Sequence, residues 1–243
     1  MASPALMDRA RRAWVGLAGV PVVFPQDGGL SVGVRADSGL CPPGWVGVVV
    51  LGGAGIVTVP GEDLIGAFAG LSVAGAVDPG LLRSRLAVRQ VLGPAALAYL
   101  DETEFRPMAG PVRVESLPVQ DAGLAELLTS VGTEDAEESG LEDVTSDVFV
   151  VRDASRVIAA AGYGHWPGAV AHLCVLTVPE YRGRHLARAV ASAATRDALQ
   201  HRLLPQWRAR PAASRRVAQR LGFRDLGTQL SLLPGTPGLL FTS

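Results

Sequence analysis

Apolar runs alternate with polar, glycine-rich and proline-rich stretches along the chain, and their spacing predicts both strands and helices. In the first part we expect a helix at 1–19, a hairpin of strands at 46–51 and 56–59, and helices at 62–71, 78–91 and 94–100. The turn-forming stretch 106–111 marks the expected domain boundary. The pattern therefore predicts an N-terminal α/β domain over 1–110 and a second domain over 111–243.

The order of elements is clearer in the second domain. Strands are expected at 112–117, 147–152, 157–164, 169–178, 204–209 and 228–233, and helices at 120–131, 185–202 and 212–221. The acidic stretch that ends at Asp143 is either a loop or a further helix. Strands 147–152 and 157–164 are expected to form a hairpin. This β-α-α-β-β-β-α-β-α-β order predicts an α/β fold of the α+β kind, built on a mixed sheet.

The composition favours a folded protein without a metal site or membrane helix. Hydrophobic residues make up 48% and charged residues 19%, so the chain can bury a core. The formal net charge of -1 argues against a general nucleic-acid binder. The two cysteines suggest neither a disulfide framework nor a zinc site, and we expect no metal. We find no signal peptide and no membrane-length apolar run, so we expect a cytoplasmic protein with no membrane partner.

Charge is distributed unevenly along the chain. Eleven arginines and one acid lie between Arg182 and Arg224, whereas six acids and no base lie between Glu134 and Asp143. A basic half could face an anionic cofactor, and an acidic rim could attract a cationic substrate. Both segments could equally be solvated helix faces.

The most informative stretch is Val175–Arg188, where a strand-like run ends at Pro179. An arginine–glycine turn follows, and a helical pattern begins near His185. The first N–H groups of a helix lack internal partners and carry the positive end of its dipole. The sequence therefore predicts a phosphate site at this turn.

The same residues resemble the acetyl-CoA loop of the GCN5-related N-acetyltransferases, the GNAT superfamily, whose pattern is Gln/Arg-x-x-Gly-x-Gly/Ala. Arg182 and Ala187 fit this pattern, while His185 occupies the position of the middle glycine. The resemblance covers Val112–Leu233, and its specific part is Leu173–Phe223.

A second segment resembles the next motif of the family, in which an Asn-x-x-Ser start opens a helix that ends in Leu-Gly-Phe. Ser214 and the run Leu221–Phe223 fit, but Pro211 occupies the asparagine position. Proline suits the first turn of a helix, and glycine suits the residue after its end. Two motifs in the family's order support each other more strongly than either does alone.

The resemblance implies that acetyl-CoA, or another acyl-CoA, is the co-substrate. In the family the fourth strand parts from its neighbour and the pantetheine arm fills the gap, bound to exposed backbone. The implied cofactor-binding residues are Leu176, Thr177, Val178, Arg182, Gly183, Arg184, His185, Leu186, Ala187, Arg188 and Ser214.

The catalytic groups are less well defined. Some family members carry a glutamate base where this chain has Ala171, so the adjacent His172 is the first candidate base. Glu142 is also a candidate, as are His165 and Glu138. The tyrosine that many members use as an acid is replaced by Ala218.

These features together predict an enzyme, an N-acetyltransferase that transfers an acetyl group to an amine of a small molecule or peptide by direct attack. The alternative is an acyl-CoA-binding module of the same fold without catalysis, with a sensing or interaction role. Contact of an arginine-rich surface at 208–224 with nucleic acid is a weaker alternative. The first domain could cap the acceptor cleft, mediate a homodimer or be a degenerate half of the same fold.

Overall fold

The computed structural model describes residues 3–235, and the chain divides into two compact units. Unit 1 comprises Met1–Leu97 with Asp225–Ser243, and unit 2 comprises Ala98–Arg224. This division differs from the expected boundary at residue 110, and it assigns the last strand of the chain to unit 1. Residues 1–2 of the expected first helix and 236–243 of the expected second domain lie outside the described residues.

Unit 1 contains a mixed sheet. Its strands lie in the order β1 (Gly29–Val34), β3 (Ala54–Val59), β2 (Val46–Leu51), β10 (Arg224–Pro234) and β4 (Val88–Tyr99). The hairpin expected from the first part is confirmed, since β2 and β3 pair antiparallel. Helix α1 (Pro4–Ala18) begins at Ser3, whose hydroxyl accepts from the N–H of Leu6, and it buries Trp14.

Three helix predictions in unit 1 are wrong. Only the five-residue α2 (Pro79–Arg83) forms within 78–91, and the segment predicted to be helical at 94–100 belongs to strand β4. Alanines in this segment favour a helix, but pairing beside β10 outweighs that weak preference. The helix expected at 62–71 is a 3-10 helix, η1 (Glu62–Phe68). A second short 3-10 turn, η2, spans Gly75–Val77.

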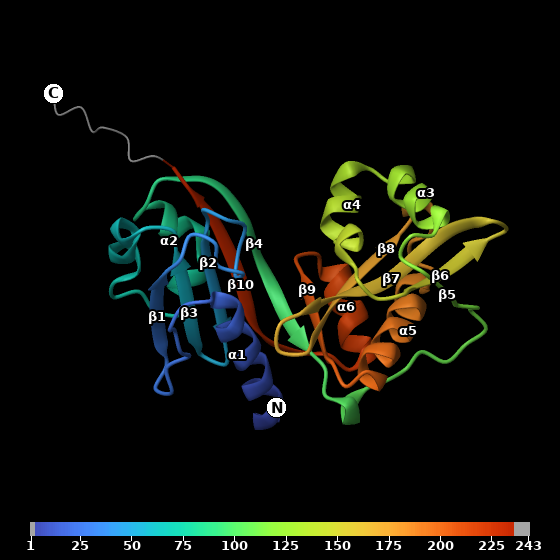
Figure 1. The fold of residues 1–243 in the computed structure, drawn as a ribbon, viewed down its shortest axis with the longest axis horizontal. Coiled ribbons are helices and arrows are strands. Elements are labelled where there is room, and N and C mark those ends of the chain that lie inside the picture. Colours follow the sequence, from blue (N-terminus) through green and yellow to red (C-terminus); the bar gives the residue numbers. More distant parts are fainter. Residues whose placement is uncertain (1–2, 236–243) are drawn as a thin grey trace. The chain divides into compact units, whose positions relative to one another are not determined.

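Unit 2 contains a mixed sheet as well. Its strands lie in the order β9 (Leu204–Ala209), β8 (Val170–Thr177), β7 (Arg156–Trp166), β6 (Val148–Asp153) and β5 (Glu115–Leu117). Strands β8 and β9 are parallel and the other neighbours are antiparallel, so the expected hairpin of β6 and β7 is confirmed. The helices are α3 (Ala122–Ser130), α4 (Thr133–Ser139), α5 (Leu186–Gln200) and α6 (Ala212–Leu221) (Figure 1). The short 3-10 turns are η3 (Glu102–Glu104), η4 (Leu141–Asp143) and η5 (Pro179–Tyr181).

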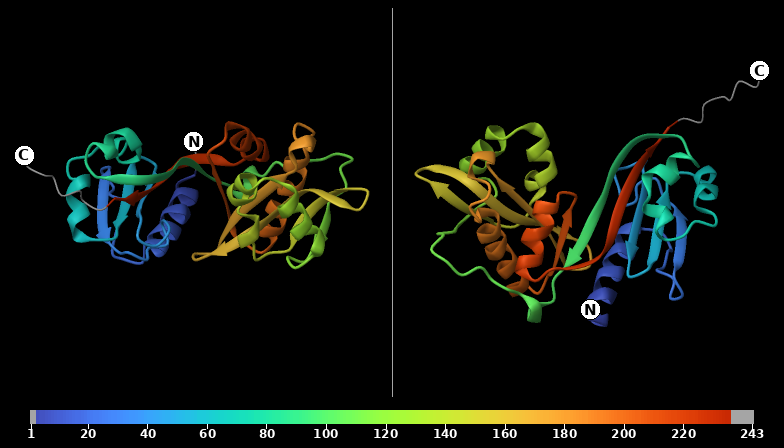
Figure 2. Two further views of the ribbon diagram at one scale, coloured as in Figure 1. Left: turned by 90° about the horizontal axis from the view of Figure 1, so that it is seen from above. Right: turned by 180° about the vertical axis from the view of Figure 1, so that it is seen from behind.

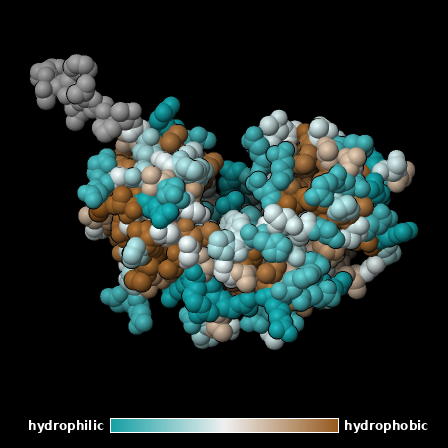
Figure 3. All heavy atoms as spheres, viewed as in Figure 1, coloured by the Kyte–Doolittle hydropathy of each residue, from teal (hydrophilic) through white to brown (hydrophobic). Residues whose placement is uncertain are grey.

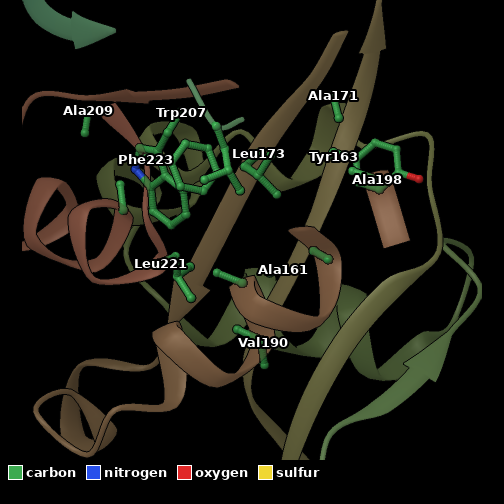
Figure 4. Close-up of a cluster of buried hydrophobic side chains, with 14 of the residues drawn as sticks. Ala161, Tyr163, Ala171, Leu173, Val190, Ala198, Trp207, Ala209, Leu221 and Phe223 are labelled. Carbon is green, nitrogen blue, oxygen red and sulfur yellow. The ribbon is translucent and has the colours of Figure 1, made fainter. Parts of the chain in front are cut away.

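Helices cover both faces of this sheet (Figure 2), and strand alternation directs side chains to each face. Leu173 belongs to the cluster built with α5 and α6, whereas Cys174 and Leu176 belong to the cluster built with α3. In the first cluster Trp207 and Phe223 meet edge to face, with ring centroids 5.5 Å apart (Figure 4). These two cores hold β8 from both sides, and the first one also packs against β9.

Among the described residues, no helix is long and apolar enough to cross a membrane, and no group of side chains is suited to hold a metal ion. The large exposed hydrophobic side chains recorded among them all belong to unit 1, on which brown atoms are visible in Figure 3. These residues are Val23, Val34, Ile65, Leu81 and Leu92.

Candidate functional site

The site lies where two parallel strands of unit 2 part. Strands β8 and β9 pair only over Val170–His172 and Leu204–Gln206, although β8 continues to Thr177 and β9 to Ala209. Their carboxyl-terminal halves therefore separate, and backbone groups on the inner edge become available to a ligand. This separation was expected from the family resemblance alone.

A cavity of about 450 Å³ fills the space between the separated strands. It is lined from β8 by Leu173, Val175, Leu176 and Thr177 and from β9 by Trp207, Arg208 and Ala209. Further lining comes from α4, from the turn after β8, from the first turn of α5, and from α6 along its length. The cavity size and its mixed lining suit a ligand with an apolar arm and a charged end.

The turn between β8 and α5 closes one end of the cavity. Gly183 has φ +79° and His185 has φ +63°, so both adopt the left-handed conformation. Histidine therefore takes the backbone conformation for which the family pattern has glycine. His185 is the N-cap of α5, and its side chain makes no capping hydrogen bond. The N–H groups of the first helical turn thus face a cavity rather than a capping side chain.

Arginines surround this turn. The Arg182 guanidinium donates from Nε to the carbonyl of Thr177 at 3.2 Å and pairs with Asp135 at 2.7 Å. Arg188 donates from Nη2 to the carbonyl of Arg220 at 3.3 Å, and its buried Nε has no hydrogen-bond partner among the described residues. A buried donor without a partner is costly, so a bound anion would stabilise Arg188.

Most of the predicted cofactor-binding residues line the cavity. They are Leu176, Thr177, Arg182, Gly183, His185, Leu186, Ala187, Arg188 and Ser214. Val178 is instead buried in the core beneath α3, and Arg184 lies over the ring of Tyr181, 5.0 Å from its centroid. These two residues are not among those that line the cavity.

Ser214 and the start of α6 form the opposite wall. The Ser214 hydroxyl accepts from the indole N–H of Trp207 at 3.0 Å, and Pro211 is the N-cap. Sequence reasoning missed Arg216 and Arg220 on the same helix, which also line the cavity. Their i, i+4 spacing places them on one helix face, so the pattern contained this signal.

The first candidate base is held in a structural arrangement. The ring of His172 stacks on Trp166 at a centroid distance of 4.3 Å, and its Nδ1 donates to Oε1 of Gln206. Burial, and then the charge of Arg208, lower the pKa of His172 to about 3. The side chain therefore remains neutral near pH 7 and is a weak proton acceptor. It is not among the residues that line the cavity.

The other candidate bases are distributed around the same region. Glu142 is exposed in η4, which packs against β7 and β8, but it does not line the cavity. Glu138 does line the cavity, and its carboxylate is paired with Arg210. His165 shares a 2.8 Å hydrogen bond through Nδ1 with the hydroxyl of Thr145. The structure therefore does not bring these groups together into one catalytic cluster.

Comparisons with known proteins bear most directly on the family resemblance of the second half of the chain. Residues 148–228 match the family model described as GNAT acetyltransferase. The resemblance of the second half to the GNAT superfamily is therefore confirmed, as is the expected mixed α+β fold of this kind. No curated protein matches the sequence significantly.

Two solved structures share the fold. A GCN5-related N-acetyltransferase-like protein from Streptococcus suis 89/1591 is 18% identical with a TM-score of 0.52, and the match covers 95% of this chain and 99% of that one. A GCN5-related N-acetyltransferase from Kribbella flavida is 17% identical with a TM-score of 0.51, and the match covers 66% of each chain. This chain thus spans about two thirds of the length of the Kribbella protein.

Proposed function

We propose that this protein is an N-acetyltransferase that transfers an acetyl group from acetyl-CoA to an amine. The observation that carries the proposal is the cavity between β8 and β9, closed at one end by the turn at Arg182–Arg188. The pyrophosphate would bind the N–H groups at the start of α5, with arginine side chains nearby. The pantetheine arm would lie along the inner edge of β8.

The reaction needs no covalent intermediate with the protein. The amine lone pair forms the new C–N bond, the C–S bond breaks, and the CoA thiolate leaves. Negative charge on the thioester oxygen would be stabilised by a backbone N–H of the parted half of β8. Ala218 is buried and offers no acid, so the thiolate would leave unprotonated or take its proton from water.

The attacking amine must lose a proton, and the candidate bases His172 and Glu142 differ in suitability. His172 has a pKa of about 3 and already donates to Gln206, so it accepts a proton poorly. Glu142 is exposed beside β8 and is the better candidate. We expect Glu142→Gln to lower kcat, with His172→Asn as the comparison variant. An unchanged kcat in Glu142→Gln would exclude Glu142 as the base.

A binding module without catalysis is the second candidate. The weak basicity of His172 and the alanine at Ala218 favour it. Both candidates require cofactor binding, so thermal unfolding with and without acetyl-CoA tests them together. Ligand at 100 times its dissociation constant stabilises the native state by about 2.7 kcal/mol. Absence of a shift would refute both, whereas a shift without thiol release across a panel of amines would favour the binding module.

A further inference from the structure

Helix α4 places two carboxylates at the cavity, and each is paired with an arginine from a different turn. Asp135 pairs with Arg182, which follows β8, and Glu138 pairs with Arg210, which follows β9. Both acids line the cavity. The helix therefore links the ends of the two separated strands through two ion pairs.

The Asp135 pair is the one that a phosphate ligand would meet. Arg182 belongs to the turn that closes the cavity, and Asp135 holds its Nη2 at 2.7 Å. The two side chains are 50% and 38% exposed, so the pair is accessible to an incoming anion. A phosphate that takes the guanidinium must replace this carboxylate and then remain close to its negative charge.

We propose that Asp135 is a specificity-determining residue that weakens the binding of phosphate-bearing ligands and leaves neutral ones unaffected. The inference rests on the proposed cofactor site, because it requires the phosphates of acetyl-CoA to lie at Arg182. Acetyl-CoA and the product CoA carry the same phosphates, so Asp135 would weaken both. Its carboxylate would thereby promote release of CoA after transfer.

The variant Asp135→Asn isolates the charge. An asparagine oxygen can still accept from Arg182, so the guanidinium keeps a partner. The Glu138–Arg210 pair and the buried Ala136 continue to hold α4. Glu137→Gln is the matched control, because Glu137 is an exposed acid of the same helix, two positions away and on a different face.

The experiment measures dissociation constants of CoA and of uncharged S-acetylpantetheine by calorimetry for the wild type and both variants. We expect Asp135→Asn to bind CoA about fivefold more tightly, the scale of a half-exposed ion pair. The affinity of Asp135→Asn for S-acetylpantetheine should equal that of the wild type, and Glu137→Gln should bind both ligands as the wild type does. Salt at about 0.5 M should reduce the gain, because exposed charges are screened.

Two results would overturn the inference while leaving the proposed function intact. One is that Asp135→Asn binds CoA with the same dissociation constant as the wild type. The other is that its dissociation constants for CoA and S-acetylpantetheine change by the same factor, which would indicate a structural role. Failure of the wild type to bind CoA is a different result, since it would overturn the cofactor site itself.

Discussion

The histidine at the start of β8 should make the stability of the protein depend on pH. His172 is stacked on Trp166, and its Nδ1 donates to Gln206. Burial and the nearby Arg208 charge disfavour the protonated ring and lower its pKa to about 3. The perturbation we choose is His172→Asn, which removes the titrating group and keeps a side-chain N–H that can reach Gln206.

The sign and size of the change in unfolding free energy with pH follow from the pKa values of His172 in the unfolded and native states. In the unfolded chain a histidine ionises near 6.5, whereas in the native state this one ionises at about 3. Between these values the unfolded chain binds more protons, so stability is present above pH 6.5 and is lost as pH falls toward 3. Each pH unit below 6.5 costs about 1.4 kcal/mol, so lowering the pH from 7 to 5 should cost about 2 kcal/mol.

The assay is urea unfolding of the wild type and His172→Asn at about pH 7 and about pH 5. Other titrating groups are common to both proteins, so their contributions cancel when the two pH-dependent losses are compared. The wild type should lose about 2 kcal/mol more than the variant. Equal losses in the two proteins would refute the assignment of His172 as a ring kept neutral by its surroundings.

Three further predictions concern other residues. Gly183→Asp should unfold at the same temperature as the wild type but show no thermal shift with acetyl-CoA, because Asp tolerates φ +79° while its charge repels phosphate. A retained shift would show that the pyrophosphate does not bind at this turn. Gly227→Ala should lower the free energy of unfolding in urea by about 2 kcal/mol, because the new Cβ would lie 1.8 Å from the carbonyl oxygen of Val50 on the facing strand. Gly16→Ala has open space around the new Cβ and should raise the free energy of unfolding by about 0.5–1 kcal/mol. Tyr163→Phe should lower the free energy of unfolding in the same assay by about 2 kcal/mol, because it removes the 2.6 Å hydrogen bond that the Tyr163 hydroxyl donates to Asp197.

The turn after β8 could be predicted from sequence because its signals are local. The strand ends at a proline, Gly183 supplies a left-handed residue, and a helix begins directly afterwards. A phosphate site at such a turn depends on backbone groups that the order of elements already positions. The substitution at His185 did not mislead, since histidine adopts the left-handed conformation there.

The strand β4 could not be predicted in the same way. Its second half contains Pro94 and several alanines, which favour a helix broken at its start. Whether such a segment forms a strand depends on a partner with free backbone groups, and β10, far along the sequence, lies beside it in the sheet of unit 1. The same long-range pairing explains why the last strand of the chain belongs to unit 1 rather than to the predicted second domain.

The acidic stretch shows why a run of like charges has to be interpreted together with its partners. Its six acids suggested attraction of a cationic acceptor, but Asp135 and Glu138 are already paired with arginines of the cavity turns. Glu142 and Asp143 are exposed in η4 beside β8. Any attraction of a cationic amine must therefore come from the remaining exposed acids, which are Glu134 and Glu137 on α4 and Glu142 and Asp143 on η4. Charge selection would then be shared between the helix and the short turn that carries the better candidate base, while Asp135 of α4 would weaken the binding of CoA.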